Sequence, residues 1–150
     1  MTANRGKYAE GKFRDMCKLY EKSAMFTYHR FPDAHSGSLV SAPADFQTLY
    51  NETLSLIEVK ETENAIRLPY GNFKSEQVNR MRMWELAGAR AFVLVYHKTT
   101  KYWRAYNVGA FLNRPADSAS WFFTGPKQNI CEPIVESLSL EEVFRRIHGM

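Results

Sequence analysis

Two acidic residues and a lysine lie close together in this sequence, at Asp45, Glu58 and Lys60. Side chains alternate along a β-strand, so Glu58 and Lys60 point to the same side of a strand that contains both. If the chain turns back at Asn51–Glu52, the hairpin places Asp45 directly opposite Glu58, with Cβ atoms about 4.5–5.5 Å apart. The sequence therefore predicts two carboxylates and one ammonium group at one place on a sheet.

Two carboxylates this close repel each other unless a proton or a cation lies between them. A hard divalent ion such as Mg²⁺ prefers oxygen ligands and keeps several of its water molecules. Bound at this pair, such an ion would acidify a water molecule and neutralise the charge that develops on phosphorus during phosphodiester hydrolysis. Lys60 stands beside the pair and would orient the water or balance charge on the phosphate. These residues favour a phosphodiesterase that uses Mg²⁺, with Mn²⁺ as a substitute.

Other interpretations of these residues stay open at this point. Exposed strands often carry alternating charges, so Glu58-Val59-Lys60 is also compatible with a solvated strand. The hairpin register is inferred, because Asn51–Glu52 is a weaker turn signal than Asn-Gly. Asp33 follows a proline and is an alternative first carboxylate, but the Ser and Gly residues after it are typical of a turn. We favour Asp45, because it precedes a strand that can pair with the strand of Glu58.

Two further polar side chains fall on the apolar faces of expected helices. Glu10 lies at the first turn of one helix and Gln77 at the first turn of another. The apolar residues on the same lines are Phe13, Cys17 and Tyr20 with Glu10, and Met81 and Trp84 with Gln77. A polar group on such a face needs a partner. A shared metal site would supply partners for both.

The hydrophobic pattern supplies the elements that would position these side chains. Apolar residues at helical spacing predict helices at residues 6–22, 75–87 and 139–148. Runs of β-branched and aromatic residues predict strands at residues 25–31, 45–50, 53–60, 90–96 and 102–106, with the last two paired. The order of these elements indicates the α/β class, with a mixed central β-sheet flanked by helices.

Several local signals set the expected ends of these elements. Ser75 is the expected N-cap of the second helix and Gly88 its stop. A capping box that begins at Ser139 opens the last helix, and a helical turn is expected at residues 107–113. Within residues 114–137 the aromatic run Trp121–Phe123 indicates a strand or a docking segment, and one of its rings would suit a dimer interface.

The length and composition fit one globular domain. The chain has 150 residues, 45% of them hydrophobic, which predicts a single domain over residues 1–150. Its net charge of +4 permits contact with a phosphate backbone without requiring it. No apolar run approaches the roughly 20 residues that span a bilayer, and the charged N-terminus is unlike a secretory signal. We expect an intracellular protein in which Cys17 and Cys131 are reduced, with no zinc site.

Several short motifs follow one another along residues 4–113. They are Asn4-Arg5-Gly6 with Glu10, Asp45-Phe46 with Tyr50, Glu58-Val59-Lys60-Glu61-Thr62 with Asn64, and Leu68-Pro69, Asn72-Phe73, Gln77 and Met81. Together they resemble the RecU-type Holliday junction resolvases of the PD-(D/E)-x-K nuclease superfamily. The resemblance is specific, because separate motifs agree in both sequence and spacing.

The resemblance implies a restriction-endonuclease-like nuclease core in which Lys60 is the catalytic lysine. Its metal ligands would be Asp45, Glu58 and Val59, supported by Glu10 and Gln77. Its DNA contacts would include Arg5, Lys7 and Lys74. Such enzymes work as homodimers that place paired symmetric nicks across four-way junctions during DNA recombination and repair. The expected location is the cytoplasm of a bacterial cell or of a phage-infected host cell.

Two departures from the family bear on the substrate. Ala44 stands where the family tends to have Ser or Thr before the catalytic aspartate. Family members also carry a long stalk before that aspartate, which enters the junction centre, whereas this chain has only residues 32–44 there. The alternatives are a compact nuclease that acts on duplex or other branched DNA, and a DNA-binding module that does not cut. The intact trio Asp45, Glu58 and Lys60 argues against the second.

Overall fold

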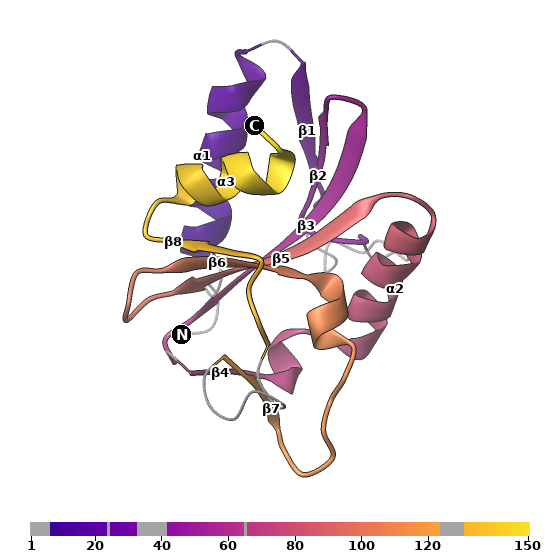
Figure 1. Ribbon diagram of the computed structural model, residues 1–150, viewed down its shortest axis with the longest axis vertical. Helices are drawn as coiled ribbons and strands as arrows, with labels where there is room; N and C mark the ends of the chain where they lie inside the picture. Colours follow the sequence, from indigo (N-terminus) through magenta and orange to yellow (C-terminus); the bar gives the residue numbers. More distant parts are fainter. Residues whose placement is uncertain (1–6, 24, 33–41, 65, 124–130) are drawn as a thin grey trace.

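The computed structural model describes residues 7–23, 25–32, 42–64, 66–123 and 131–150. They form a mixed six-stranded sheet in the order β1-β2-β3-β5-β6-β8 and a separate two-stranded sheet of β4 and β7 (Figure 1). The strands are β1 (Phe26–Arg30), β2 (Phe46–Tyr50), β3 (Thr53–Thr62), β4 (Arg67–Pro69), β5 (Arg90–His97), β6 (Trp103–Asn107), β7 (Ser120–Phe122) and β8 (Val135–Ser137). The helices are α1 (Lys7–Glu21), α2 (Ser75–Leu86) and α3 (Leu140–His148), with 3-10 turns η1 (Tyr70–Asn72) and η2 (Val108–Phe111). This architecture confirms the expected mixed sheet flanked by helices.

The hairpin of β2 and β3 has the register that the sequence predicts. Phe46 pairs with Ile57 in the antiparallel ladder, so the next step brings Asp45 opposite Glu58. The two turn residues, Asn51–Glu52, have φ values of 49° and 65°. Positive φ at both positions is the geometry of a type I′ turn, whose twist matches that of the strands it joins. The turn therefore sets the register even though neither residue is glycine.

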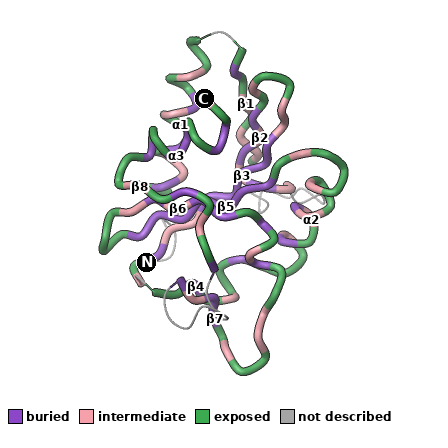
Figure 2. Tube along the Cα trace, in the orientation of Figure 1, coloured by how far each residue is buried: buried purple, intermediate pink, exposed green. Residues whose placement is uncertain are grey.

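Different elements cover the two faces of the sheet (Figure 1). β3 and β5 pair in parallel, with α2 as part of the crossover between them, and both strands are buried along most of their length (Figure 2). The core that α1 and α3 share with the sheet includes Phe13, Ile57, Val59, Leu94 and Phe144. The core on the opposite face, beneath α2, η2 and β7, includes Leu56, Met81, Val93, Phe111 and Trp121. Because side chains alternate along β3, Glu58 and Lys60 share the second face with Leu56.

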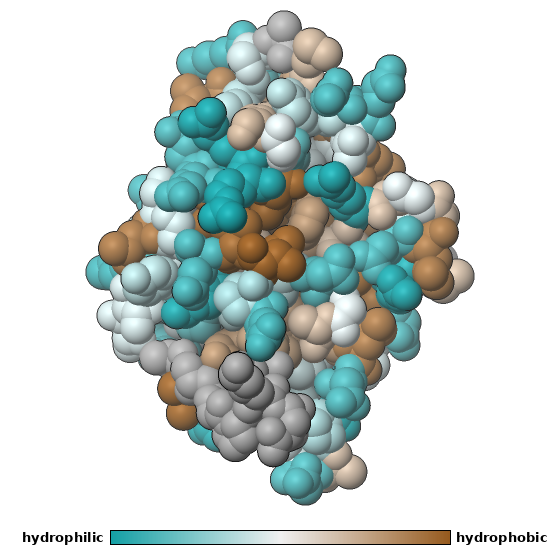
Figure 3. All heavy atoms as spheres, viewed as in Figure 1, coloured by the Kyte–Doolittle hydropathy of each residue, from teal (hydrophilic) through white to brown (hydrophobic). Residues whose placement is uncertain are grey.

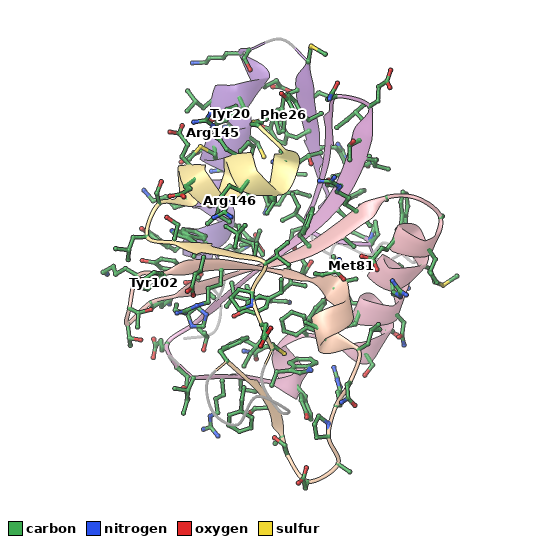
Figure 4. All side chains as sticks on the ribbon, in the orientation of Figure 1. Tyr20, Phe26, Met81, Tyr102, Arg145 and Arg146 are labelled. Atoms are coloured by element: carbon green, nitrogen blue, oxygen red, sulfur yellow. The ribbon has the colours of Figure 1, made fainter. Side chains whose placement is uncertain are left out.

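Most expected elements are present, and the differences have local causes. The N-cap of α2 is Lys74 rather than Ser75, because Lys74 already has the extended backbone of a cap residue. The buried line of α2 runs through Val78 and Met81, and this places Trp84 at its margin, 37% exposed (Figure 4). The sequence pattern missed β4 and β8, since strands of three residues are too short to show a period, whereas β7 coincides with the aromatic run that was expected to be a strand or a docking segment. None of the described helices could span a membrane.

The expected details at the other helix ends and in the aromatic run can also be compared. Ser139 is the N-cap of α3 and its hydroxyl accepts from the Glu142 backbone N–H at 3.3 Å, as predicted. Gly88 follows α2 with a φ of 117°, which agrees with the expected stop. Trp121 and Phe123 are buried within this chain. Those two rings therefore belong to its own core rather than to a dimer interface.

His148 anchors the last turn of α3 to β2. Its Nε2 lies 2.9 Å from the Thr48 hydroxyl and its Nδ1 lies 2.8 Å from the Phe144 carbonyl oxygen. A neutral ring satisfies both contacts by donating from Nδ1 and accepting at Nε2. The rings of Tyr20 and Phe26 pack beside α3 in the same core (Figure 4). Burial lowers the pKa of His148 from 6.5 to about 4, which keeps the ring neutral.

The folded protein should lose stability as the pH falls from 6.5 towards 4. Burial lowers the pKa of both His148 and His97 to about 4, so in this window the unfolded chain binds more protons than the folded one. Stability is therefore complete above the unfolded value of 6.5 and falls as the pH approaches the folded value, by about 2–3 kcal/mol per histidine. Urea denaturation at several pH values measures this loss. His148→Gln should flatten the dependence, whereas His29→Gln, at an exposed position, should leave it unchanged.

Candidate active site

The structure brings Asp45, Glu58 and Lys60 together on two neighbouring strands. Asp45 stands half-buried just before β2, and its Oδ2 accepts a hydrogen bond from the Val59 backbone N–H at 2.8 Å. Glu58 is buried in the middle of β3, with 3% of its surface exposed. Its Oε2 lies 2.8 Å from the Lys60 ammonium nitrogen. The residues that the hairpin register predicted as neighbours are neighbours, and their catalytic roles stay a prediction.

One oxygen of Glu58 lacks a partner among the described residues. Oε1 is fully buried and accepts no hydrogen bond there. A buried charged oxygen in this state costs free energy. Lys60 neutralises the other oxygen, and its ammonium group also lies 5.2 Å from the centre of the Phe73 ring. The unpartnered Oε1 is therefore the natural place for a further cation.

Asp45 lies in a crowded acidic environment. Burial, followed by the negative charges of Glu58 and Glu10, raises the pKa of its carboxyl group well above the usual range. The hydrogen bond from Val59 and the charge of Lys60 lower the same pKa, but their effects are smaller. A carboxyl group in these surroundings holds a proton unless a cation takes its place.

Glu10 adds a third carboxylate from the first turn of α1, far from the hairpin in sequence. Its Oε2 lies 3.4 Å from an Arg30 nitrogen at the end of β1. The next residue of that segment, Phe31, donates its backbone N–H to the Asp45 carbonyl oxygen at 2.9 Å. Arg30 therefore binds Glu10 next to a main-chain contact with Asp45. Sequence reasoning missed it, because no motif marks an arginine at the end of an otherwise ordinary strand.

A cleft of about 280 Å³ opens beside the carboxylates. Asp45 and Lys60 line one part of it, and Lys74, Gln77 and Arg80 line the part formed by α2. Gln77 thus faces the same space as the predicted catalytic residues, and Lys74 supplies positive charge at its margin. Arg80 was not predicted, although its position one turn after Gln77 on the same helix was a usable signal.

Four other residues named from the sequence are not seen to bring a side chain to the cleft among the described residues. Arg5, and the alternative carboxylate Asp33, lie outside the described residues. Lys7 is exposed at the first position of α1. The Val59 side chain packs into the core with α1 and α3, so Val59 can reach the site only through its main chain.

The residues fit a divalent metal ion on chemical grounds. Within the described ranges no group of three or more His, Cys, Asp or Glu side chains is arranged to hold a metal. Mg²⁺, however, commonly takes one or two carboxylates and completes its shell with water. Asp45 and Glu58 supply two hard oxygen ligands, and the buried Oε1 of Glu58 needs a positive partner. Two carboxylates at this position are therefore sufficient for such an ion.

Two comparisons with known proteins give matches. The family model for recombination protein U, RecU, matches residues 39–114, which is half of the chain and includes the hairpin and Gln77. Among solved structures, the Holliday junction resolvase Hjc of Archaeoglobus fulgidus is similar over 73% of this chain and 82% of that chain, with 22% identity and a TM-score of 0.48. No curated protein matches the chain.

Asp45→Asn should stabilise the metal-free protein while it removes a predicted metal ligand. Burial and the neighbouring carboxylates raise the pKa of Asp45, so the corresponding stability is present at low pH and lost as the pH rises through the folded-state pKa. The amide remains neutral and still offers an oxygen to the Val59 N–H. At pH 8 with EDTA we expect a gain of about 1–2 kcal/mol in the free energy of unfolding, measured with urea.

The matched control is Asp15→Asn on the exposed side of α1, which should change stability little. Added Mg²⁺ should stabilise the wild type and have little effect on Asp45→Asn. A metal-free wild type more stable than Asp45→Asn would contradict the inferred crowding of carboxylates.

Proposed function

The chain belongs to the RecU family of Holliday junction resolvases, and on that premise we propose that it cuts four-way DNA junctions by magnesium-dependent hydrolysis at Asp45, Glu58 and Lys60. The observation that carries the proposal is the buried carboxylate pair, with one unpartnered oxygen and a lysine bound to the other, beside an open cleft. Paired nicks at such junctions would serve DNA recombination and repair. The Mg²⁺ ion is the finer part of the proposal, and Mn²⁺ should substitute for it.

The proposed chemistry follows from which carboxylate oxygens already accept a hydrogen bond or form an ion pair. Asp45 Oδ2 is held by the Val59 N–H, which orients the other oxygen, Oδ1, for a cation. Glu58 would hold the same cation through Oε1, because Oε2 is bound to Lys60 and Oε1 accepts no hydrogen bond among the described residues. When bound, a divalent ion acidifies a water molecule and neutralises charge on the phosphate. The Lys60 ammonium has three donors, so after binding Glu58 it can still orient a water molecule or contact a phosphate oxygen.

The cleft suits a phosphate backbone. Lys74 at the N-cap of α2 and Arg80 within the helix line it together with Asp45, and both carry positive charge. Backbone contacts of this kind position DNA without reading its sequence. Lys74, Lys7 and Arg5 are the DNA contacts that we propose, and Gln77 and Glu10 would support the metal site from the two helices. The main chain of Val59 would add a ligand beside Glu58.

We also propose that the active form is a homodimer, because two symmetric nicks need two active sites related by a two-fold axis. Exposed apolar side chains support this assembly. Met83 and Leu86 at the end of α2 are 69% and 70% exposed, and Leu112 beside η2 is 42% exposed. Figure 3 shows apolar atoms over this part of the molecule. A second copy of the chain would cover such a surface.

One observation favours an alternative substrate. The segment before Asp45, residues 32–44, is too short for the stalk that enters the junction centre in other family members. A compact enzyme of this kind could act on duplex or other branched DNA, with the same chemistry. A cleavage assay on both DNAs distinguishes the two substrates.

Cleavage of a labelled four-way junction, beside a matched linear duplex and with Mg²⁺, tests the proposal. The wild type should place paired symmetric nicks in the junction, and Lys60→Ala should lower the rate about a hundredfold or more. Lys22→Ala, an exposed lysine at the far end of α1, is the control and should cut normally. Equal cutting of both DNAs would retain the nuclease and reject the junction preference. Tight junction binding without any cutting would reject the enzyme.

Mixed dimers test the assembly. Sedimentation should give about twice the chain mass of 17.4 kDa. When wild type is mixed with an excess of Lys60→Ala, the proposed dimer exchanges subunits, and a cruciform plasmid should be nicked on one strand instead of being linearised. A monomer mass together with full linearisation in the mixture would count against the dimer.

A further inference from the structure

Arg114 joins the segment before α2 to β7. Its guanidinium group donates hydrogen bonds to the Tyr70 carbonyl oxygen, at 3.3 Å, and to the Phe73 carbonyl oxygen. The same group lies over two aromatic rings, 5.2 Å from the centre of Tyr70 and 5.1 Å from the centre of Trp121. These four contacts hold a half-buried arginine that follows η2 by only a few residues.

The two carbonyl groups that Arg114 binds belong to the residues just before and just after a short segment that forms one wall of the cleft. Between Tyr70 and Phe73 the chain forms η1, and Gly71 and Asn72 of this turn line the cleft. Arg114 itself does not line the cleft, so it reaches the proposed active site only through this segment. Figure 1 shows β4, η1 and β7 beside one another, apart from the six-stranded sheet. Because this segment is not part of the six-stranded sheet, the hydrogen bonds of that sheet do not fix the position of the cleft wall.

Phe73 connects this wall to the proposed catalytic lysine. Its side chain is fully buried, and its ring centre lies 5.2 Å from the Lys60 ammonium nitrogen. A cation over a ring face is attracted to it, and the attraction grows when water is excluded. The ring therefore helps to hold Lys60 in its place beside Glu58. Since Arg114 binds the Phe73 carbonyl oxygen, a change at Arg114 displaces the ring that contacts Lys60.

The chemistry of arginine suits this place better than that of lysine. A planar guanidinium presents five donors in fixed directions and can stack on aromatic rings while it donates in its plane. Arg114 uses both properties, with two carbonyl acceptors and two rings. Both hydrogen bonds come from the same nitrogen, Nη2, so a lysine could replace the charge and donate from its ammonium group, but it has no planar group to lie over the rings of Tyr70 and Trp121.

We propose that Arg114 is a positioning residue for the reaction: it clamps the cleft wall through the carbonyl groups of Tyr70 and Phe73 and thereby aligns the Phe73 ring with Lys60. This inference deepens the proposed function and rests on it for the kinetic consequence. Displacement of a reacting group by about 1 Å can lower a rate a hundredfold. Arg114→Met should therefore lower kcat about ten- to a hundredfold and leave the junction-binding constant within about threefold.

The first measurement does not depend on catalysis. Proton–carbon NMR of the whole chain reports the Lys60 side chain, which is assigned by its absence in Lys60→Ala. In the wild type the Phe73 ring should shift the Lys60 side-chain protons upfield. Arg114→Met should reduce this shift, and Arg104→Met should not. Arg104 is a matched control, because it also combines an ion pair, with Glu136 at 2.8 Å, and a ring contact, with Tyr102 at 5.0 Å.

An unchanged Lys60 shift in folded Arg114→Met would overturn the inference. Where Arg114→Met does not fold, Arg114→Lys decides, because it keeps the charge but loses the planar group over Tyr70 and Trp121, and should still lose the upfield shift. This result is independent of nuclease activity, so a wild type that cuts no DNA would reject the proposed function without affecting the test of Arg114.

A double-mutant cycle with Phe73→Leu gives the kinetic test. If Arg114 acts through the Phe73 ring, then Arg114→Met should lower kcat much less in the Phe73→Leu background than in the wild type. Equal losses in the two backgrounds would mean that Arg114 only stabilises the fold, and would overturn the positioning role. Arg104→Met should leave kcat within about twofold in both backgrounds.

Discussion

The hairpin of β2 and β3 holds the carboxyl groups of Asp45 and Glu58 side by side, where two negative charges would repel each other, and much of the site is organised around that constraint. The hairpin holds the two carboxylates together, and the consequence is visible in the raised pKa of Asp45 and in the unpartnered oxygen of Glu58. Lys60 compensates one carboxylate oxygen and Val59 N–H another. Among the described residues, Glu58 Oε1 accepts no hydrogen bond. Under the proposed function a divalent cation would supply the missing positive charge, so the proposed activity depends on this geometry.

The parts of this site that the sequence could predict are those that depend on local periodicity. Alternation along β3 placed Glu58 beside Lys60, and the position of a two-residue turn placed Asp45 opposite Glu58. Helical spacing placed Gln77 towards the cleft. These relations connect residues within one element or across one turn. The helix limits were mostly predictable for the same reason, because long amphipathic segments and caps leave a clear pattern.

What the sequence could not predict depends on contacts between distant segments. Arg30 meets Glu10 across 20 residues, and Arg114 meets Phe73 across 41. The short strands β4 and β7 pair across more than fifty residues, and neither is long enough to show a period of its own. Trp84, expected on the apolar face of its helix, is 37% exposed because the buried line of α2 runs through Val78 and Met81. In each case the residue type is common at such positions, and its role follows from the neighbours that the fold brings to it.

The turn at Asn51–Glu52 limits how this chain can change over evolutionary time. Both residues have left-handed backbone conformations, and substitutions such as glycine would suit them. A change in length is different. One residue added or removed here would shift β2 against β3 by one position and turn every side chain of one strand to the other face. Asp45 would then leave Glu58, and Phe46 would leave the core. Related chains should therefore vary freely in the composition of this turn, while insertions and deletions accumulate elsewhere.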